Sequence, residues 1–444
     1  MYAARVSFCF AAIWMASWRD IAWCETPPPG KSASDSASVV FSVGGAYRDI
    51  TPERAMPNYN GDRLEPDKNA TPLRVQAIVL DDGMTRVAVL SVDCTFLGRT
   101  EVGRIRDALH RRFELAPEHV CIAATHTHTS PATTASFLTG ALPEPAYINV
   151  LIEKSLEAVE QAISRLQPAR IVAASIAAPP IGFCRRRIDS SGQVYMTGSE
   201  PKLDSPLPAE NPIDDRMQYA VFEDMARRPL AIAFNVACHN NMIARVFSAD
   251  MFGRAGDEMR AAMGDVATVI LAAPCGDVSP RKPDGRSTYA NDRLAGRAIA
   301  DAILASYKSQ PYIDGGQIVV RSVVRQIPDR PYDAPAFGYD NGRGSDARAR
   351  EHFQRRYGPE EAAVRERGAT QCDVEFQAIA FGEVAIVTNP AELFSIYGVK
   401  IKEASPFKVT FVSSLTNGYC GYVPTLEAFS HGGYETYRTV YTSR

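Results

Sequence analysis

The chain has seven histidines, and two of them, His126 and His128, lie two residues apart in a Thr-His-Thr-His stretch. This stretch follows an apolar run, residues 120–124, that predicts a buried strand. In extended backbone, side chains two residues apart point to the same side, about 6.5–7 Å from each other. Imidazole is a common zinc ligand and also titrates near neutral pH. The pair therefore indicates metal binding or acid–base chemistry, with a structural role as an equally weighted alternative.

Four other polar clusters also follow apolar, strand-like runs. They are His239 after 230–237, Gly276 to Pro280 after 267–272, Asn389 to Glu392 after 384–388, and Asn417 to Tyr422 after 409–415. Open α/β sheets place their sites at the carboxyl ends of strands. Taken singly, each cluster also fits an ordinary turn, because Gly-Asp and Asn-Gly form turns and a proline before Glu392 suits a helix start. As a set, the five clusters predict one shared crevice.

Alternating helical and strand-like segments must position these clusters. Asp82-Gly83 between the apolar runs 73–80 and 86–92 predicts a β-hairpin, and a second hairpin is predicted over 375–388. Apolar periodicity predicts strands at 169–174 and 317–324 and helices over 101–113, 147–166, 253–263 and 292–307. The alternation predicts an α/β fold, with a mixed β-sheet core flanked by helices and the active site at the C-terminal ends of strands. No internal repeat is visible, and residues 328–367 form an excursion from this core.

The composition excludes several classes of protein. The chain has 444 residues, of which 45% are hydrophobic and 22% are charged, as in ordinary globular proteins. A net charge of −3 provides no basic field for nucleic acid. No apolar run reaches the roughly 18–20 residues needed to span a bilayer. The nine cysteines are scattered, and no Cys-x-x-Cys pair suggests a zinc knuckle or a redox motif.

The N-terminal segment is predicted to direct export. Residues 1–24 carry Arg5 and then an apolar stretch of signal-sequence length, although Ala22-Trp23-Cys24 is a poor cleavage site. A frayed N-terminal helix or a start codon placed too early is the alternative. Residues 25–38 read as a Pro- and Ser-rich linker. We therefore expect a single catalytic domain over 39–444 in a periplasmic or secreted protein.

The motifs, in this order, resemble a known family. Thr125 to His128, Ala237 to His239, Gly276 to Pro280, Pro390 to Glu392 and Tyr419 to Thr425 look like the signature of the neutral/alkaline non-lysosomal ceramidase N-terminal domain. The segments Asp49-Ile-Thr-Pro52 and Gly182 to Arg186 fit as well. The resemblance extends from about residue 42 to 434 and covers nearly all of the expected catalytic domain.

The resemblance implies a set of site residues. One zinc ion per chain would be held by His126, His239, Glu392 and Tyr422, and the site would be lined by His128, Arg185, Ser279 and Tyr434. Two neutral imidazoles, a carboxylate and a phenolate would neutralise a divalent cation, which could in turn ionise the phenol. A zinc-activated water would attack an amide carbonyl. His128 would act as acid or base, Tyr434 would assist it, and Arg185 would bind the oxyanion or an anionic group of the substrate. Ser279 could hydrogen-bond the substrate or the water, but no acyl-serine triad is supported.

The sequence departs from the family pattern at six positions near these motifs. They are Thr129-Ser130 for Ser-Gly, Asn240 for Pro, Cys184 for Asn, Ala391 for Gly and Arg281 for Asn. All four implied ligands are kept, but the pocket wall changes. The chain ends ten residues after Tyr434, so we expect the family's C-terminal domain to be absent. The leading prediction is a zinc-dependent amidohydrolase acting on ceramide or a related N-acyl lipid. The alternatives are a zinc hydrolase of a small polar amide or ester, and a metal-free binding protein.

Overall fold

The computed structural model describes residues 41–136, 141–197, 205–328 and 371–436, together with positions 362 and 366. The predicted export signal, the linker and most of the predicted excursion over 328–367 lie outside the described residues. Within them, three four-stranded units have the same strand order and the same pairing pattern. In each unit the first two pairs are antiparallel and the last pair is parallel.

The first unit contains the predicted hairpin at Asp82-Gly83. Its strands are β1 (Ser42–Asp49), β4 (Arg74–Asp81), β5 (Arg86–Val92) and β6 (Val120–Ala124). Helix α2 (Arg99–Phe113) joins β5 to the parallel strand β6, and α3 (Pro145–Ser164) follows. Gly83 has a φ of 84°, which a glycine adopts without steric cost, so the turn is tight.

The second unit repeats this order. Its strands are β7 (Gln167–Ala177), β11 (Arg216–Asp224), β12 (Pro229–Asn235) and β13 (Ala267–Ile270). Helix α4 (Asp250–Met263) joins β12 to the parallel strand β13, and α5 (Asp292–Tyr307) follows. β1 and β7 pair at two residues each, so the two units form one eight-stranded sheet.

The third unit forms a separate sheet. Its strands are β15 (Ile318–Pro328), β16 (Gln371–Phe381), β17 (Val384–Thr388) and β19 (Val409–Ser413). Helix α7 (Ser395–Ala404) joins β17 to the parallel strand β19, and α8 (Leu426–His431) lies near the end. The three units thus repeat one strand topology, although no repeat is visible in the sequence.

Short elements complete the described chain. They are β2 (Met56–Pro57), β3 (Arg63–Leu64), β8 (Phe183–Cys184), β9 (Arg186–Ile188), β10 (Val194–Met196), β14 (Val278–Ser279), β18 (Glu392–Leu393), β20 (Tyr422–Val423), and the 3-10 turns η1 (Pro117–His119) and η3 (Tyr434–Thr436). β14 pairs with β8 and β18 pairs with β20. These small ladders join segments that contain the predicted site residues.

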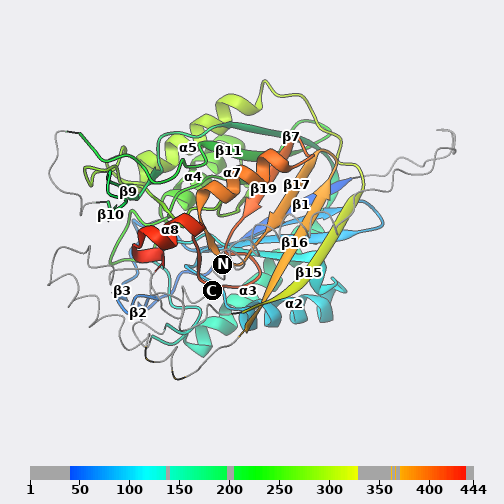
Figure 1. The fold of residues 1–444 in the computed structure, drawn as a ribbon. Coiled ribbons are helices and arrows are strands. Elements are labelled where there is room, and N and C mark those ends of the chain that lie inside the picture. The colour runs from blue at the N-terminus through cyan, green and yellow to red at the C-terminus, as the bar shows by residue number, and fades with distance from the viewer. Residues whose placement is uncertain are drawn as a thin grey trace.

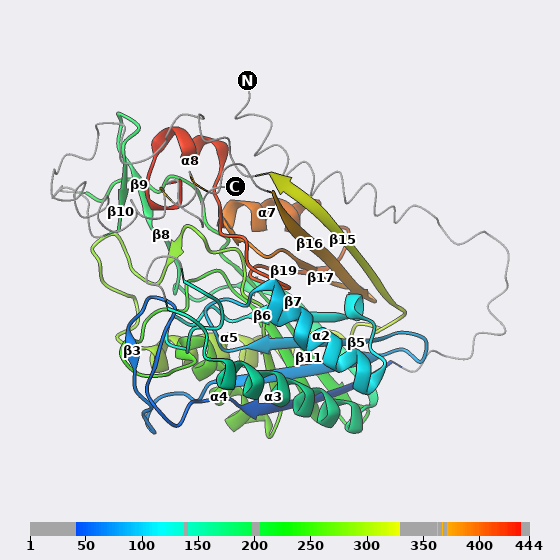
Figure 2. The ribbon, with the colours of Figure 1, turned by 90° about the horizontal axis from the view of Figure 1, so that it is seen from below.

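An apolar core fills the space between the sheets. All twelve strands of the three units contribute side chains to it, and the rings of Phe222 and Phe381 pack 6.2 Å apart across the gap. Helices cover the outer faces: α2 and α3 on the first unit, α4 and α5 on the second, and α7 on the third. Figure 1 shows α4 and α5 at the top, α2 and α3 at the bottom, and the third unit at the right. Figure 2 shows the third unit from below.

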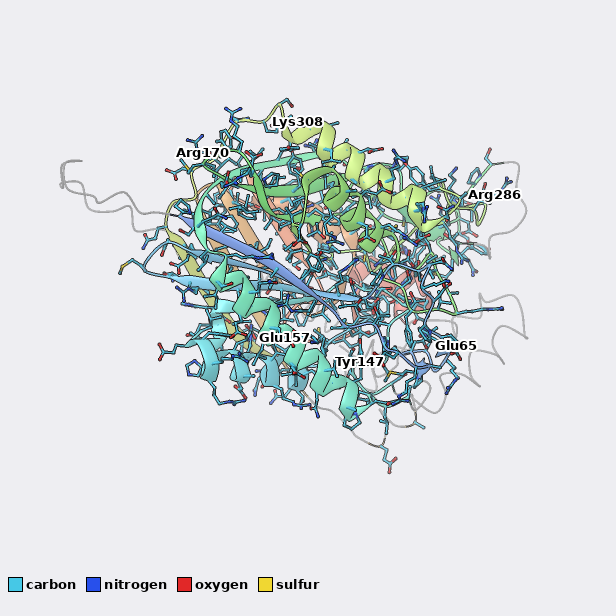
Figure 3. The ribbon with its side chains drawn as sticks, turned by 180° about the vertical axis from the view of Figure 1, so that it is seen from behind. Glu65, Tyr147, Glu157, Arg170, Arg286 and Lys308 are labelled. Atoms are coloured by element: carbon cyan, nitrogen blue, oxygen red, sulfur yellow. The ribbon has the colours of Figure 1, made fainter. Side chains whose placement is uncertain are left out.

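The helices present an apolar stripe to the sheets and charged side chains to solvent. On α3, Tyr147 is buried, whereas Glu157 pairs with Arg48 at 2.9 Å, and both labelled side chains lie along this helix in Figure 3. None of the helices in the described part of the chain is both long enough and apolar enough to cross a bilayer.

The predicted α/β class with a mixed sheet is confirmed, and every predicted helix is present within a few residues. Of the twelve strands in the three units, two, β1 and β11, were not predicted. β1 contains Gly44 and Gly45, which disfavour a strand by propensity. The structure explains Gly44, because a Cβ there would lie 2.0 Å from the carbonyl oxygen of Ala162 in α3. Close packing of α3 against β1 thus requires glycine at position 44, and glycine is a residue that makes a strand hard to predict from the sequence.

A buried ion pair links the first and third units. The guanidinium of Arg106 on α2 binds the carboxylate of Glu375 on β16 at 2.7 and 2.9 Å, and both side chains are about one-tenth exposed. Replacing Arg106 with methionine is expected to lower the free energy of unfolding by about 3–5 kcal/mol, because it leaves a buried carboxylate unpaired. Urea unfolding measures this loss. The double variant Arg106→Met/Glu375→Met should be less destabilised than Arg106→Met, and an equal or larger loss would contradict the explanation.

Candidate active site

Loops from all three units meet at one place. The loop after β6 carries His126 and His128, the loop after β12 carries His239, and the loops after β17 and β19 carry Glu392 and Tyr422. The imidazole rings of His126 and His239 lie 4.7 Å apart, and Nε2 of each lies 3.5 Å from Oε2 of Glu392. These side chains are at most 3% exposed. Four loops that are distant in sequence therefore meet at one buried polar cluster.

The Thr-His-Thr-His stretch is held by hydrogen bonds from its threonines. Thr125 donates to the carboxylate of Asp93 at 2.9 Å, and Thr127 donates to the carbonyl of Ser248 at 2.6 Å. The expectation of extended backbone is wrong at His126, which is left-handed with a φ of 62°. Such a conformation costs about 1–3 kcal/mol in a non-glycine residue and is typical of functional sites. It brings the rings of His126 and His128 to 4.8 Å, closer than the extended spacing.

Backbone carbonyls fix the tautomers of two histidines. Nδ1 of His126 lies 3.1 Å from the carbonyl oxygen of Thr95, and Nδ1 of His239 lies 2.7 Å from that of Val278. A carbonyl oxygen only accepts, so each Nδ1 carries the proton and each Nε2 keeps its lone pair. Metal-ligating histidines are commonly oriented in this way. The Nε2 atoms of His126 and His239 therefore face the carboxylate of Glu392 as hydrogen-bond acceptors.

Glu392 and Tyr422 are neighbours by strand register. β18 pairs with β20 in parallel, and Glu392 lies opposite Tyr422 in that ladder. Oε1 of Glu392 accepts a hydrogen bond from the hydroxyl of Tyr419 at 2.8 Å, which leaves Oε2 toward the imidazoles. The hydroxyl of Tyr422 accepts from Arg185 at 3.3 Å.

The arrangement fits a bound cation. Nε2 of His126, Nε2 of His128 and Oε2 of Glu392 are buried, and none has a hydrogen-bond partner. Leaving such atoms unsatisfied is costly, so they require an explanation. One ring nitrogen from each of His126, His128 and His239 lies within 4.8 Å of the other two. A metal ion with nitrogen and oxygen ligands would satisfy the atoms of His126 and Glu392 together, with His128 beside it.

The ionisation states agree with this explanation. Burial, with the neighbouring His126 and His239, lowers the pKa of His128 well below its usual value. Burial and Arg185 lower the pKa of His239 to about 4. Burial alone would raise the pKa of Glu392, but His126 and His239 hold it well below its usual value. At neutral pH His128 and His239 are thus neutral imidazoles, and Glu392 is a carboxylate.

Tyr422 is a different case. Burial and the Glu392 carboxylate raise the pKa of its phenol well above 10. Without a cation the phenol therefore keeps its proton at neutral pH. Ligation by Tyr422 as a phenolate requires the positive charge of a metal.

Arg185 and Tyr434 border the cluster. Nη1 of Arg185 lies 3.5 Å from Nε2 of His239, and its guanidinium lies over the rings of Tyr422 and Tyr434, at 5.6 and 5.7 Å. The Tyr422 and Tyr434 rings meet edge to face at 5.6 Å. The structure thus brings seven of the eight predicted site residues into contact with one another.

Ser279 is connected less directly. Its hydroxyl accepts the backbone N–H of Arg281 at 3.2 Å, as in an ordinary turn. The contact of this segment with the cluster is made by the carbonyl of Val278, the neighbouring residue, with His239. The sequence motif therefore positions a histidine through its backbone.

The sequence interpretation gave no role to Tyr419 or Glu435. Tyr419 holds Glu392 and stacks on Phe96 at 3.8 Å between ring centroids, and its place in the Tyr-x-x-Tyr motif was the available signal. Glu435 binds Arg185, and no pattern in the sequence indicated it.

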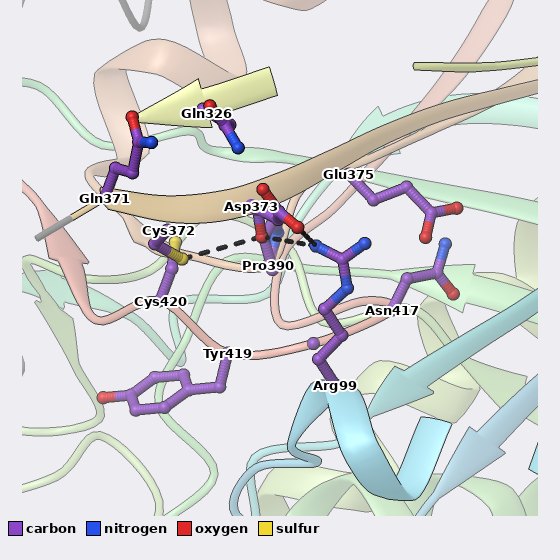
Figure 4. A pocket seen from close by; sticks show the side chains of 11 residues that line it. Arg99, Gln326, Gln371, Cys372, Asp373, Glu375, Pro390, Asn417, Tyr419 and Cys420 are labelled. Carbon is purple, nitrogen blue, oxygen red and sulfur yellow. Dashed lines mark hydrogen bonds and ion pairs between the residues drawn. The ribbon is translucent and has the colours of Figure 1, made fainter. Parts of the chain in front are cut away.

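A separate cavity of about 310 Å³ lies on another side of Tyr419. Figure 4 shows Tyr419 with an exposed ion pair between Arg99 and Asp373, 3.3 Å apart. None of the predicted metal ligands lines this cavity. Tyr419 therefore borders both the cavity and the cluster.

For a divalent cation bound at this cluster, replacing Tyr419 with phenylalanine is expected to raise the dissociation constant about tenfold, because a carboxylate that ligates a metal depends on its hydrogen-bonded partner. Competition with a chromogenic chelator measures the constant. Tyr147→Phe is the matched control, since the Tyr147 hydroxyl is buried without a hydrogen-bond partner and belongs to the outer core of the first unit. Equal affinities for the two variants would contradict the role given to Tyr419.

The chain is similar to known proteins in its structure. No family profile matches the sequence, and no curated protein matches it. The neutral ceramidase from Pseudomonas aeruginosa is similar with a TM-score of 0.69 and 17% identity, over 92% of this chain and 72% of that chain. A ceramidase in complex with C2 gives a TM-score of 0.68 and 18% identity, over 91% and 73%. The chain therefore has the fold of the neutral ceramidases, as its sequence motifs implied.

Proposed function

We propose that this protein is a zinc-dependent hydrolase that cleaves N-acyl amide bonds, with His126, His239, Glu392 and Tyr422 as the metal ligands. The observation that supports it best is the group of buried, unpartnered acceptor atoms on His126, His128 and Glu392. Hydrocarbon packing would not leave such atoms together. A binding protein without metal would have no use for them.

Zinc bound there would polarise the amide carbonyl and acidify a water molecule that attacks it. His128, whose Nε2 is buried beside the ligands, would move a proton to the leaving amine. Arg185 would stabilise the negative charge that develops on the carbonyl oxygen, and Tyr434 would assist with a hydrogen bond. Ser279, whose hydroxyl accepts the Arg281 amide, would still be able to donate its O–H to the substrate.

For the substrate we propose ceramide or a related N-acyl lipid. Both similar structures are ceramidases, and one was solved with C2. A smaller polar amide or ester is the second candidate, because Asn240 stands where the family pattern has Pro, directly after the proposed ligand His239, and its polar side chain donates to the carbonyl of Ala249 at 3.1 Å. The wall beside the proposed acid–base group therefore differs from the family pattern.

The test uses the purified full chain. We expect about one zinc per chain, hydrolysis of N-acyl sphingosine in detergent micelles, and loss of activity on chelation that zinc restores. Short soluble N-acyl amines form the second arm, and activity confined to them would refute the lipid substrate. Full activity after complete removal of metal would refute the zinc mechanism.

We also propose that residues 39–444 act as one catalytic domain and that residues 1–24 direct export. The shared core of the three units supports a single domain, because no unit could bury its inner face alone. A reporter fused after residue 24 tests export, and retention inside the cell would refute it.

A further inference from the structure

Two adjacent arginines lie buried beside the candidate metal cluster. The side chain of Arg185 is 14% exposed and that of Arg186 is 0% exposed. Burying an unpaired charge costs several kcal/mol, so each guanidinium requires a carboxylate. The partners available decide where each guanidinium points.

Glu435 is the carboxylate that joins the two. Its Oε1 lies 2.6 Å from Nε of Arg185 and its Oε2 lies 2.6 Å from Nη1 of Arg186, and the residue is fully buried. Burial alone would raise the pKa of Glu435, but Arg185 and Arg186 hold it below its usual value. Glu435 is therefore ionised, and it directly follows Tyr434 in η3.

This contact determines the orientation of Arg185. With Nε bound to Glu435, the outer nitrogens of the guanidinium are directed into the site. Nη2 donates to the carbonyl of Gly276 at 2.7 Å and to the hydroxyl of Tyr422 at 3.3 Å, and Nη1 approaches His239. A positive charge so near two predicted zinc ligands would repel a cation unless a negative charge offset it.

Accepting the proposed function, we propose that Glu435 is a positioning residue: it orients Arg185 toward the reacting carbonyl and offsets the charge of Arg185 beside the metal. Arg186, the other partner of Glu435, holds the segment that carries Tyr434, because it also donates to the carbonyl of Gly432 at 2.6 Å. α8 and η3 are thereby joined to β9, and Figures 1 and 2 both show α8 beside β9 and β10.

Glu210 provides a matched comparison. It is 3% exposed, binds Nη2 of Arg186 at 3.0 Å and lies 2.8 Å from Nδ1 of His431, but its ion pairs do not include Arg185. A purely structural role for the buried ion pairs would make Glu435 and Glu210 equivalent. Of these two glutamates, only Glu435 can act on the site by orienting Arg185.

The experiment compares zinc affinity and turnover in the full chain for Glu435→Gln, Glu210→Gln, Arg185→Ala and the double variant Glu435→Gln/Arg185→Ala. Glu435→Gln is expected to raise the zinc dissociation constant about tenfold, which is the usual effect of residues behind the ligands. Removal of Arg185 as well should return the constant close to the wild-type value, because the uncompensated charge is gone. Glu210→Gln should lower the melting temperature and leave zinc affinity unchanged.

Turnover provides the second readout. Glu435→Gln, saturated with zinc, is expected to lose about 100-fold in kcat through misplacement of Arg185, with a smaller change in KM. The double variant should lose no more than Arg185→Ala, since both act through one group. Glu435→Asp, which keeps the charge, replaces Glu435→Gln if that variant does not fold, and should lose kcat by displacing Arg185.

The proposal is overturned if Glu435→Gln has wild-type zinc affinity, if removing Arg185 fails to restore it, or if Glu210→Gln has the same effect. Zinc binding without hydrolysis of any amide would refute the proposed function, while the affinities would still decide the role of Glu435. A wild-type chain that binds no zinc would refute both.

Discussion

Alanine in place of His126, His239 or Glu392 is expected to abolish stoichiometric zinc binding and to lower kcat/KM about 1,000-fold or more. A metal supplies several kcal/mol of transition-state stabilisation, and each 1.36 kcal/mol corresponds to a factor of ten in rate. Each of these side chains has one atom directed at the others: Nε2 of both histidines lies 3.5 Å from Oε2 of Glu392. Elemental analysis of the purified variants and steady-state kinetics measure the two losses.

The control for the histidines is His110→Ala. Nδ1 of His110 contacts the carbonyl of Leu115 at the end of α2, outside the cluster. This variant should keep its zinc and its activity. Wild-type turnover by any of the three cluster variants, with zinc retained, would show that the metal is held elsewhere.

The replacement of His128 with glutamine should separate a proton-transfer role from a ligand role. We expect kcat to fall by about 10²–10⁴-fold while zinc is retained, which is the usual contribution of a positioned acid or base. The pKa of His128 lies well below its usual value because of burial and the two neighbouring histidines, so the ring is neutral and can accept a proton. Its ring centroid is 4.8 Å from that of His126 and 5.8 Å from that of His239.

The leaving group provides the sharper measurement. The p-nitroaniline leaving group of an N-acyl p-nitroaniline needs less protonation than an alkylamine. The kcat for this substrate should therefore fall less in His128→Gln than the kcat for an N-acyl alkylamine. Loss of zinc from this variant, equal to that in His126→Ala, would instead make His128 a metal ligand. The close approach of the three histidine nitrogens, within 4.8 Å, makes this outcome a real test.

The kind of each local element was largely predictable from the sequence. Apolar runs such as Val120–Ala124 and the turn at Asp82-Gly83 follow from side-chain period and turn chemistry, which act over a few residues. β1 was missed for a non-local reason: Gly44 is required by the approach of α3, far along the chain. Propensity contains no information about such a contact.

The candidate site divides in the same way. The sequence indicated His126, His128 and His239 by residue type and by their place after strands, and the resemblance of the motifs to a known family added Glu392 and Tyr422. Their distances could not be read from it, because they depend on how three units pack around one core. The left-handed backbone at His126 was not predicted either, and the contacts beside it, from His126 to Thr95 and from Thr125 to Asp93, join residues about 30 positions apart in the chain.

The sequence by itself thus determined most of the strands, the longer helices and the histidines at the strand ends, because these follow from local periodicity and residue type. The tertiary structure alone decided that three units of one topology share a core, and that Glu435 lies against Arg185. The physical reason is burial. Packing the inner faces of the three units against each other removes the loops at the strand ends from water. A buried charge in these loops is then stable only beside a partner of opposite charge, and that partner can come from any part of the chain.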